Sequence, residues 1–188
     1  MKEIIKLGLI LFLISAVAAA ALGFVNAVTK GPIEAASKLA DTQTRKVILS
    51  DADDFKSLEI SSPDKYPLIR EIYQGSKGGD TCGYTFKTVP KGYGGTIEVL
   101  IGIDTQGTVT GVDIGNQNET PGLGTKAKDE KFKGQYTGKN AQLSVIKSGT
   151  PKDDEISAIS GATISSRAVT SGVNEALKYY QENLKDKN

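Results

Sequence analysis

The strongest pattern in the chain is a long apolar stretch near its N-terminus. Between Leu7 and Thr29 no side chain carries a charge, and nearly every residue is apolar. A helix of this length would be about 34 Å long, enough to cross a hydrocarbon core of about 30 Å. Lys2 and Lys6 precede the stretch, and because positive charge favours the cytoplasmic side, we expect a cytoplasmic N-terminus. The pattern predicts a single-pass anchor of the cell (inner) membrane over residues 1–30, with residues 31–188 outside the cytoplasm.

The same stretch is open to two other interpretations. Val25-Asn26-Ala27 resembles a signal-peptide cleavage site, although the apolar stretch exceeds the roughly 7–15 residues usual in such peptides. A core helix of a cytosolic protein would also be apolar. The length of the stretch favours a retained anchor over both.

After the anchor, the pattern changes from helical to alternating and then back to helical. Apolar residues at helical spacing predict an amphipathic helix over Pro32–Leu49 and another over Ser165–Asn183. The acidic segment 51–67 predicts a loop with one short strand. Four segments read as strands, with a hairpin turn at 104–107 between the last two: 68–73, 84–89, 96–103 and 108–114. The expected fold class is therefore α+β, an antiparallel sheet meander with flanking helices, preceded by one transmembrane helix.

The composition excludes several kinds of chemistry. The chain has no His and a single Cys, Cys82. It therefore has no Ser-His-Asp or Cys-His pair, no His-ligated zinc or haem, no intrachain disulfide and no protein-held iron–sulfur cluster. A formal net charge of +1 gives no case for nucleic-acid binding. If the protein does redox chemistry, an organic cofactor must carry it.

The segment Ser160-Gly161-Ala162-Thr163-Ile164-Ser165-Ser166 comes directly before the last predicted helix. The free N–H groups and positive dipole end of a helix N-terminus favour a bound phosphate, and the small residues allow close approach to the backbone. Ser and Thr are also common N-caps of helices that bind nothing. On spacing alone, the cap is the simpler interpretation.

Two glycine-rich loops are further candidates. Glu119-Thr120-Pro121-Gly122-Leu123-Gly124-Thr125 would form a tight loop whose amides face a planar ligand or an anion, or an ordinary turn. Lys91-Gly92-Tyr93-Gly94-Gly95 is a turn, or a loop whose Tyr93 leans on a ring. Taken singly, each segment is a modest signal.

The order of these motifs resembles the FMN-binding domain family. Gly-Tyr-Gly-Gly, a strand and hairpin, Glu-Thr-Pro-Gly-Leu-Gly, and Ser-Gly-Ala-Thr before a C-terminal helix occur in the family's order, and the last two motifs at this separation are a specific signal. The resemblance covers essentially the whole chain. Within the family, the anchor and the length are most similar to the G subunits of Rnf-type ion-translocating electron transport complexes. The C subunits of the sodium-pumping NADH:quinone reductases share the same plan.

The resemblance implies that FMN is joined to the last residue of Ser-Gly-Ala-Thr, Thr163, through a phosphoester. A flavin transferase that uses FAD and magnesium would attach it. The phosphate would stay at the helix N-terminus and the ring would lie along the second loop. The implied cofactor-binding residues are Thr163, Ser160, Gly161, Ala162, Ile164, Ser165, Ser166, Glu119, Thr120, Pro121, Gly122, Leu123, Gly124 and Tyr93. The family's motif usually carries Asp three residues before its Ser, where this chain has Ser157.

The implied function is electron relay in a membrane complex that moves electrons between ferredoxin and NAD and couples them to Na⁺ or H⁺ transport. No side chain need act as acid, base or nucleophile, and no metal site is expected. The implied partners are the complex's other membrane subunits. Two other functions remain open: a membrane-tethered or secreted binding module without redox activity, and a free-standing flavoprotein reductase.

Overall fold

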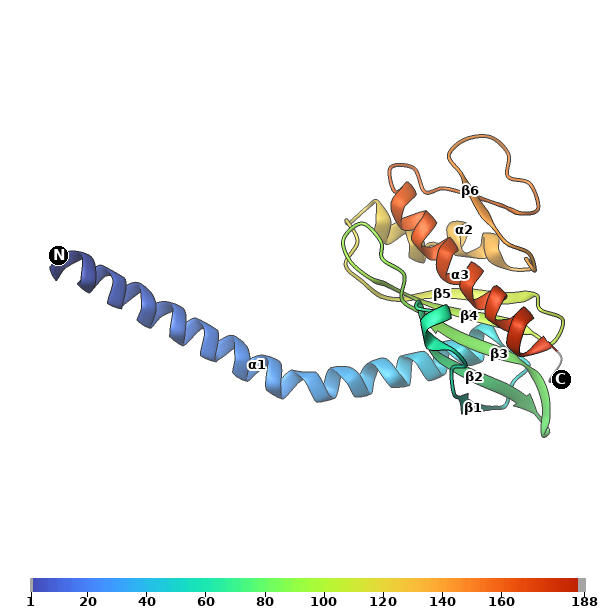
Figure 1. The fold of residues 1–188 in the computed structure, drawn as a ribbon, viewed down its shortest axis with the longest axis horizontal. Coiled ribbons are helices and arrows are strands. Elements are labelled where there is room, and N and C mark those ends of the chain that lie inside the picture. Colours follow the sequence, from blue (N-terminus) through green and yellow to red (C-terminus); the bar gives the residue numbers. More distant parts are fainter. Residues whose placement is uncertain (1, 186–188) are drawn as a thin grey trace. The chain divides into compact units, whose positions relative to one another are not determined.

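A computed structural model describes residues 2–185 of the chain, apart from the side chains at positions 34 and 38. The contacts divide the chain into two compact units, one ending at Ala40 and the other beginning at Asp41. The second unit contains the sheet, the C-terminal helix and all three candidate motifs (Figure 1). The assignment of residues 1–30 as anchor and 31–188 as domain stays a prediction.

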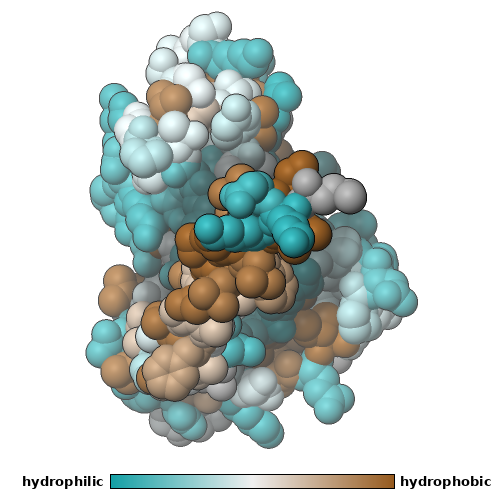
Figure 2. All heavy atoms as spheres, turned by 90° about the vertical axis from the view of Figure 1, so that its left-hand side faces the viewer, coloured by the Kyte–Doolittle hydropathy of each residue, from teal (hydrophilic) through white to brown (hydrophobic). Residues whose placement is uncertain are grey.

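The first element is one helix, α1 (Lys2–Ile48), where the sequence predicted two. Pro32, the first residue of the second predicted helix, lies inside α1, where it removes a single backbone hydrogen bond. The helix is long and apolar enough to cross a membrane, and none of the residues in its most apolar window is buried, which disfavours the core-helix interpretation. Seen from its N-terminal side, α1 shows apolar side chains behind a hydrophilic tip (Figure 2).

The predicted antiparallel meander is confirmed. In the five-stranded sheet, each strand pairs antiparallel with the next along the chain, so that the sheet order equals the sequence order. The strands are β1 (Asp54–Leu58), β2 (Ile69–Lys77), β3 (Asp80–Thr88), β4 (Ile97–Asp104) and β5 (Val109–Gln117). Because successive side chains of a strand point to opposite faces, β4 contributes Val99, Ile101 and Ile103 to one face and Glu98, Leu100 and Gly102 to the other.

One face of the sheet packs against the C-terminal helix α3 (Thr163–Asn183), which crosses it in Figure 1. The strand residues Ile101 and Ile103 share a buried cluster with Val169, Val173 and Leu177 of the helix. These helix positions recur at the spacing of one helix face. The predicted helix is confirmed, and it starts two residues earlier than Ser165.

The other face of the sheet packs against the last turns of α1, residues 41–48. Gly102 of β4 and its cross-strand partner Gly111 of β5 lie under this helix end. A methyl group added at Gly102 would lie 2.5 Å from the carbonyl oxygen of Ile48, and the Thr110 hydroxyl donates a hydrogen bond to that oxygen. Gly75 and Gly83 leave similar room for the side chain of Leu49. The glycines therefore form a shallow groove that the helix end fills.

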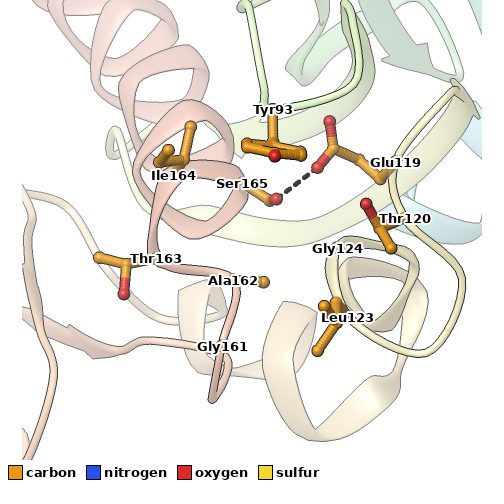
Figure 3. Close-up of a pocket in the computed structure, with 10 residues that line it drawn as sticks. All are labelled: Tyr93, Glu119, Thr120, Leu123, Gly124, Gly161, Ala162, Thr163, Ile164 and Ser165. Atoms are coloured by element: carbon orange, nitrogen blue, oxygen red, sulfur yellow. Dashed lines mark hydrogen bonds between the residues drawn. The ribbon is translucent and has the colours of Figure 1, made fainter.

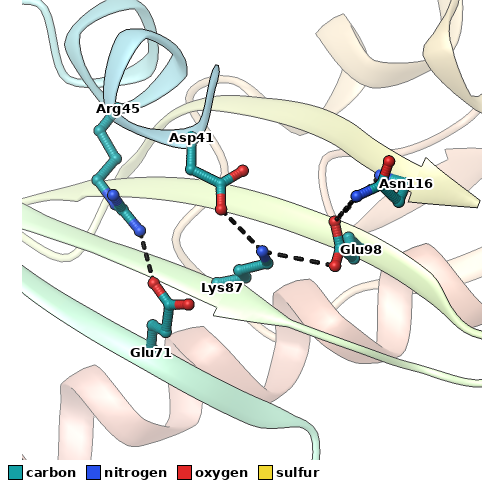
Figure 4. Close-up of polar contacts among 6 residues, drawn as sticks. All are labelled: Asp41, Arg45, Glu71, Lys87, Glu98 and Asn116. Carbon is teal, nitrogen blue, oxygen red and sulfur yellow. Dashed lines mark hydrogen bonds and ion pairs between the residues drawn. The ribbon is translucent and has the colours of Figure 1, made fainter. Parts of the chain in front are cut away.

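Charged side chains surround this packing (Figure 4). Lys87 Nζ lies 2.8 Å from Asp41 Oδ2 and 3.5 Å from Glu98 Oε1. The Lys87 and Asp41 side chains are only 11% and 10% exposed. Arg45 of α1 pairs with Glu71 of β2 at 2.7 Å. These pairs connect α1 to β2 and β3, and β3 to β4.

Short elements that the sequence did not predict lie between β5 and α3. They are the 3-10 turns η2 (Gly124–Lys128) and η3 (Gly134–Tyr136), the short helix α2 (Glu130–Lys133), and the parallel strands β6 (Ser144–Ile146) and β7 (Glu155–Ser157). Asn174 of α3 fixes this segment by bonding both the N–H and the carbonyl of Leu143. Such tertiary contacts leave no periodic pattern in so short a strand.

Candidate functional site

A pocket of about 510 Å³ lies where the three candidate motifs meet. Figure 3 shows its lining residues: Tyr93, Glu119, Thr120, Leu123, Gly124, Gly161, Ala162, Thr163, Ile164 and Ser165. All of them are among the residues that the sequence singled out. Motifs separated by dozens of residues in the sequence thus form one site.

The wall after β5 is a tight turn, as predicted. The carbonyl of Thr120 accepts hydrogen bonds from the N–H groups of Leu123 (3.1 Å) and Thr125 (3.4 Å). Gly122 has a φ of +76°, which is a left-handed conformation that glycine adopts at little cost. The turn leaves the Leu123 side chain 42% exposed at the pocket.

The opposite wall is the loop that leads into α3. Gly161 has a φ of +77° and approaches Leu123, whose Cδ2 lies 3.1 Å from where a Cβ would stand on Gly161. The N-cap residue of α3 is Ala162, with no side-chain hydrogen bond to the helix, so the interpretation of this motif as a Ser or Thr cap is wrong. Thr163 is the first helical residue, and its side chain is half-buried at the pocket wall.

Three apolar side chains around the pocket are unusually exposed. Tyr93, in the loop between β3 and β4, is 71% exposed, Ile164 is 55% exposed and Leu123 is 42% exposed. In residues 49–185 these are the strongly exposed large hydrophobic side chains. Exposed apolar groups that gather at one concave place are typical of a ligand-binding site.

A buried carboxylate joins the three walls. Glu119, only 5% exposed, accepts a 2.9 Å hydrogen bond on Oε1 from the N–H of Gly94. Its Oε2 accepts a hydrogen bond from the hydroxyl of Ser165. The sequence identified Glu119 as a residue along the ring but missed the contribution of the Gly94 amide, whose glycine-rich loop was noted only for Tyr93.

Four of the predicted cofactor residues do not line the pocket. Pro121 and Gly122 are exposed at the turn and do not contribute to the pocket lining. Ser166 is buried, and its hydroxyl accepts a hydrogen bond from Ile159 N–H and donates one to the Ala162 carbonyl. Ser160 lines a neighbouring hollow of about 680 Å³. The Ser166 hydroxyl therefore stabilises the loop before α3 by two hydrogen bonds and does not face the pocket.

Ser157, which replaces the family's usual Asp, lies in that neighbouring hollow together with Asp129 and Gln135. Its N–H donates to Gln135 Oε1 (2.8 Å), and its carbonyl accepts from Gln135 Nε2 (3.3 Å). The backbone at this position is thus held by a side chain from η3. Elsewhere, in β3, burial raises the pKa of the Cys82 thiol, which favours its unreactive form.

The chain is similar in sequence to known proteins over almost its whole length. Residues 92–178 match the FMN-binding domain, and residues 1–48 match the RnfG N-terminal region. The G subunit of the Na(+)-translocating ferredoxin:NAD(+) oxidoreductase complex of Acetobacterium woodii is 45% identical over 194 residues, covering 96% of this chain and 93% of that protein.

Two further proteins extend the comparison. The G subunit of the proton-translocating ferredoxin:NAD(+) oxidoreductase complex of Clostridium ljungdahlii is 36% identical over 135 residues, covering 72% of this chain and 69% of that protein. The crystal structure of NqrC from Shewanella oneidensis has the same fold, with a TM-score of 0.55 at 16% identity over 75% of this chain and 74% of that one.

Proposed function

The chain belongs to the family of G subunits of ion-translocating ferredoxin:NAD(+) oxidoreductase complexes, and we propose that it serves such a complex as an electron-carrying flavoprotein. FMN is the cofactor, joined to Thr163 by a phosphoester. The protein is a relay within an oxidoreductase rather than a stand-alone catalyst. The two relatives described above are named for different coupling ions, so the family leaves the ion open.

The make-up of the pocket is the observation that carries this proposal. Its volume of about 510 Å³ lies within the roughly 300–1,000 Å³ of small-molecule sites. The exposed side chains of Tyr93, Leu123 and Ile164 offer apolar surface to a flat ring, and an aromatic side chain can stack on one. The residues present therefore fit a flavin.

Thr163 is suited to hold the phosphate. As the first residue of α3, it lies beside helix N–H groups that have no acceptor within the helix and beside the positive end of the helix dipole. No side chain caps these N–H groups by a hydrogen bond, since the N-cap is Ala162. Arg167 is exposed one turn later, on the same helix face as Thr163, and adds a positive charge there.

When bound, FMN supplies the redox chemistry, since a flavin exchanges electrons with both one-electron and two-electron carriers. The chain binds and orients it: Thr163 holds one end, and the walls of the pocket hold the ring. We expect the attachment to require a flavin transferase that transfers FMN from FAD to the Thr163 hydroxyl and releases AMP. The other expected partners are membrane subunits of the complex.

The location follows from α1. A helix long and apolar enough to span a membrane, with Lys2 and Lys6 at its start, favours a single-pass anchor with a cytoplasmic N-terminus. The flavin domain then lies on the extracytoplasmic side of the cell (inner) membrane. An anchor keeps the domain beside its partner subunits.

Thr163→Val tests the proposal most simply. Valine keeps the shape of threonine but has no hydroxyl, so we expect complete loss of flavin fluorescence from the denatured protein in a gel. Thr120→Val is the matched control, because Thr120 also lines the pocket but is not the attachment residue, and it should keep its fluorescence. Fluorescence retained in Thr163→Val would exclude Thr163, and a wild-type chain without flavin would favour a non-redox binding module.

A further inference from the structure

The carboxylate of Glu119 is buried although no cationic side chain among the described residues pairs with it. Charged side chains are rarely this buried unless an opposite charge pairs with them. Among the described residues, no lysine or arginine forms an ion pair with Glu119. Its partners are the Gly94 N–H and the Ser165 hydroxyl, both donors. An ionised carboxylate accepts on both oxygens, which matches this environment.

The surrounding backbone is shaped to receive this group. A Cβ at Gly92 would lie 2.4 Å from Glu119 Oε1, and a Cβ at Gly124 would lie 2.3 Å from Oε2. Each carboxylate oxygen is thus accommodated by one glycine and bonded by one donor. The two donors come from the loop before β4 and from the first turn of α3, so that Glu119 connects all three segments that line the pocket.

A buried charge without a cation beside it acts strongly on its neighbours. Interactions between charges grow as the effective dielectric constant falls away from that of water, and a side chain 5% exposed is largely removed from water. Glu119 itself lines the pocket (Figure 3). A ligand in the pocket therefore experiences a fixed negative charge from this wall.

We propose that Glu119 is a positioning residue that holds the three walls of the flavin pocket together and that its negative charge makes the bound flavin harder to reduce. The proposal rests on FMN binding at this site. Reduction adds electrons to the ring, and a fixed negative charge nearby disfavours that addition. Glu119 thereby contributes both to the geometry of the pocket and to the potential at which the relay works.

The charge is tested on the full chain in detergent, with flavin attached. Glu119→Gln keeps the shape and one acceptor oxygen but removes the charge, so we expect its midpoint potential to shift to a more positive value in a spectroelectrochemical titration. Glu130→Gln makes the same charge change at a side chain that is 82% exposed and does not line the pocket, and it should leave the potential unchanged. Ser165→Ala keeps the charge and should give no positive shift.

The positioning role is tested without flavin, in the Thr163→Val background. Glu119→Ala removes the acceptor of the Gly94 N–H, so amide exchange at Gly94 should become about tenfold faster or more, as expected for a lost hydrogen bond to a charged group. Because this readout needs no cofactor, it separates a failure of the proposal from a failure of FMN binding, which intact mass reports in each preparation.

Two results would overturn the proposal. A flavin-loaded Glu119→Gln protein with the wild-type potential would show that the charge does not act on the ring. Unchanged exchange at Gly94 in Glu119→Ala would show that the carboxylate does not hold the loop. In either case flavin attached to the wild-type chain would leave the proposed function intact.

Discussion

The sheet face that packs against the end of α1, here called the outer face, and the pocket beside α3 both contain glycines that leave room for other groups, but those groups differ. On the outer face, Gly102 and Gly111 leave room for Ile48 at the end of α1, and the buried charges of Lys87 and Asp41 pair with each other. At the pocket, Gly92 and Gly124 leave room for one buried carboxylate, and apolar side chains beside it stay exposed. Glycines whose free space is filled by the chain's own helix indicate packing. Glycines beside apolar side chains that remain exposed indicate a ligand site.

The largest effect is expected where charge is buried on the outer face. Lys87→Ala leaves the buried carboxylate of Asp41 without its cation and should cost about 3 kcal/mol of unfolding free energy, near the lower end for a broken buried pair. Lys65→Ala is the control, because Lys65 and Glu182 form a pair with side chains 53% and 38% exposed, and exposed pairs contribute little. A thermal midpoint, Tm, of Lys87→Ala equal to that of Lys65→Ala would contradict the account.

The same pair predicts a dependence on pH. Burial lowers the pKa of Lys87, but the hydrogen bond to Asp41 and the charges of Asp41 and Glu98 outweigh this and raise it above its ordinary value of 10.5. A group whose folded pKa is raised contributes its full stability below the unfolded value and loses it as pH rises through the folded value. The difference in Tm between wild type and Lys87→Ala should therefore be constant near neutral pH and shrink above about 10.5.

Paired glycine substitutions separate the two regions. Gly102→Ala forces a methyl group against the Ile48 backbone and should cost about 1–3 kcal/mol, the usual range for overpacking. The folded fraction should keep its flavin. Gly111→Ala is the control, since its methyl group would meet Ile48 at 3.3 Å, and its loss of stability should be smaller.

Gly124→Ala should behave in the opposite way. Its methyl group would meet side-chain atoms of Glu119 and Ser165, which move more readily than backbone, so the cost in stability should be about 1 kcal/mol. Flavin content, measured by absorbance per protein, should fall because the walls of the pocket are displaced. Full flavin content in Gly124→Ala, or a loss of flavin from folded Gly102→Ala, would break the comparison.

The smallest effects on stability are expected at exposed apolar side chains. Ile164 at the pocket and Val47 at the end of α1 are 55% and 77% exposed, so Ile164→Ser and Val47→Ser should each change the unfolding free energy by less than about 0.5 kcal/mol. Only Ile164→Ser should alter the absorbance spectrum of the flavin. Equal spectra in both variants would indicate that Ile164 does not contact the ring.

Local pattern was enough to predict the sheet. In β4, Val99, Ile101 and Ile103 pack toward α3 and alternate with Glu98, Leu100 and Gly102, because the opposite face carries a charge and the glycine that leaves room for the end of α1. Strand ends were less accurate, since they depend on pairing: β5 continues to Gln117 because that residue pairs with Ile97. The anchor and the helix from Pro32 were predicted separately but form one helix, because the backbone continues as a helix on both sides of Pro32.

The pocket was predictable as a set of residues but not as an arrangement. Thr163, Leu123 and Ile164 could be singled out because each belongs to a local motif. The partners of Glu119 are 25 and 46 residues away along the chain, and no local pattern connects them. The groove under Ile48 was missed for the same reason. A glycine in a strand sequence does not indicate which distant residue packs against it.

The central claim is that FMN is attached to the hydroxyl of Thr163. Cleavage after Lys152 and Arg167 releases a peptide of residues 153–167 that contains Thr163 together with Ser157, Ser160, Ser165 and Ser166. Mass spectrometry of this peptide from the full chain should show the mass of one FMN less one water, with fragment ions that assign it to Thr163. An unmodified peptide, or a flavin assigned to any of the four serines, would contradict the account.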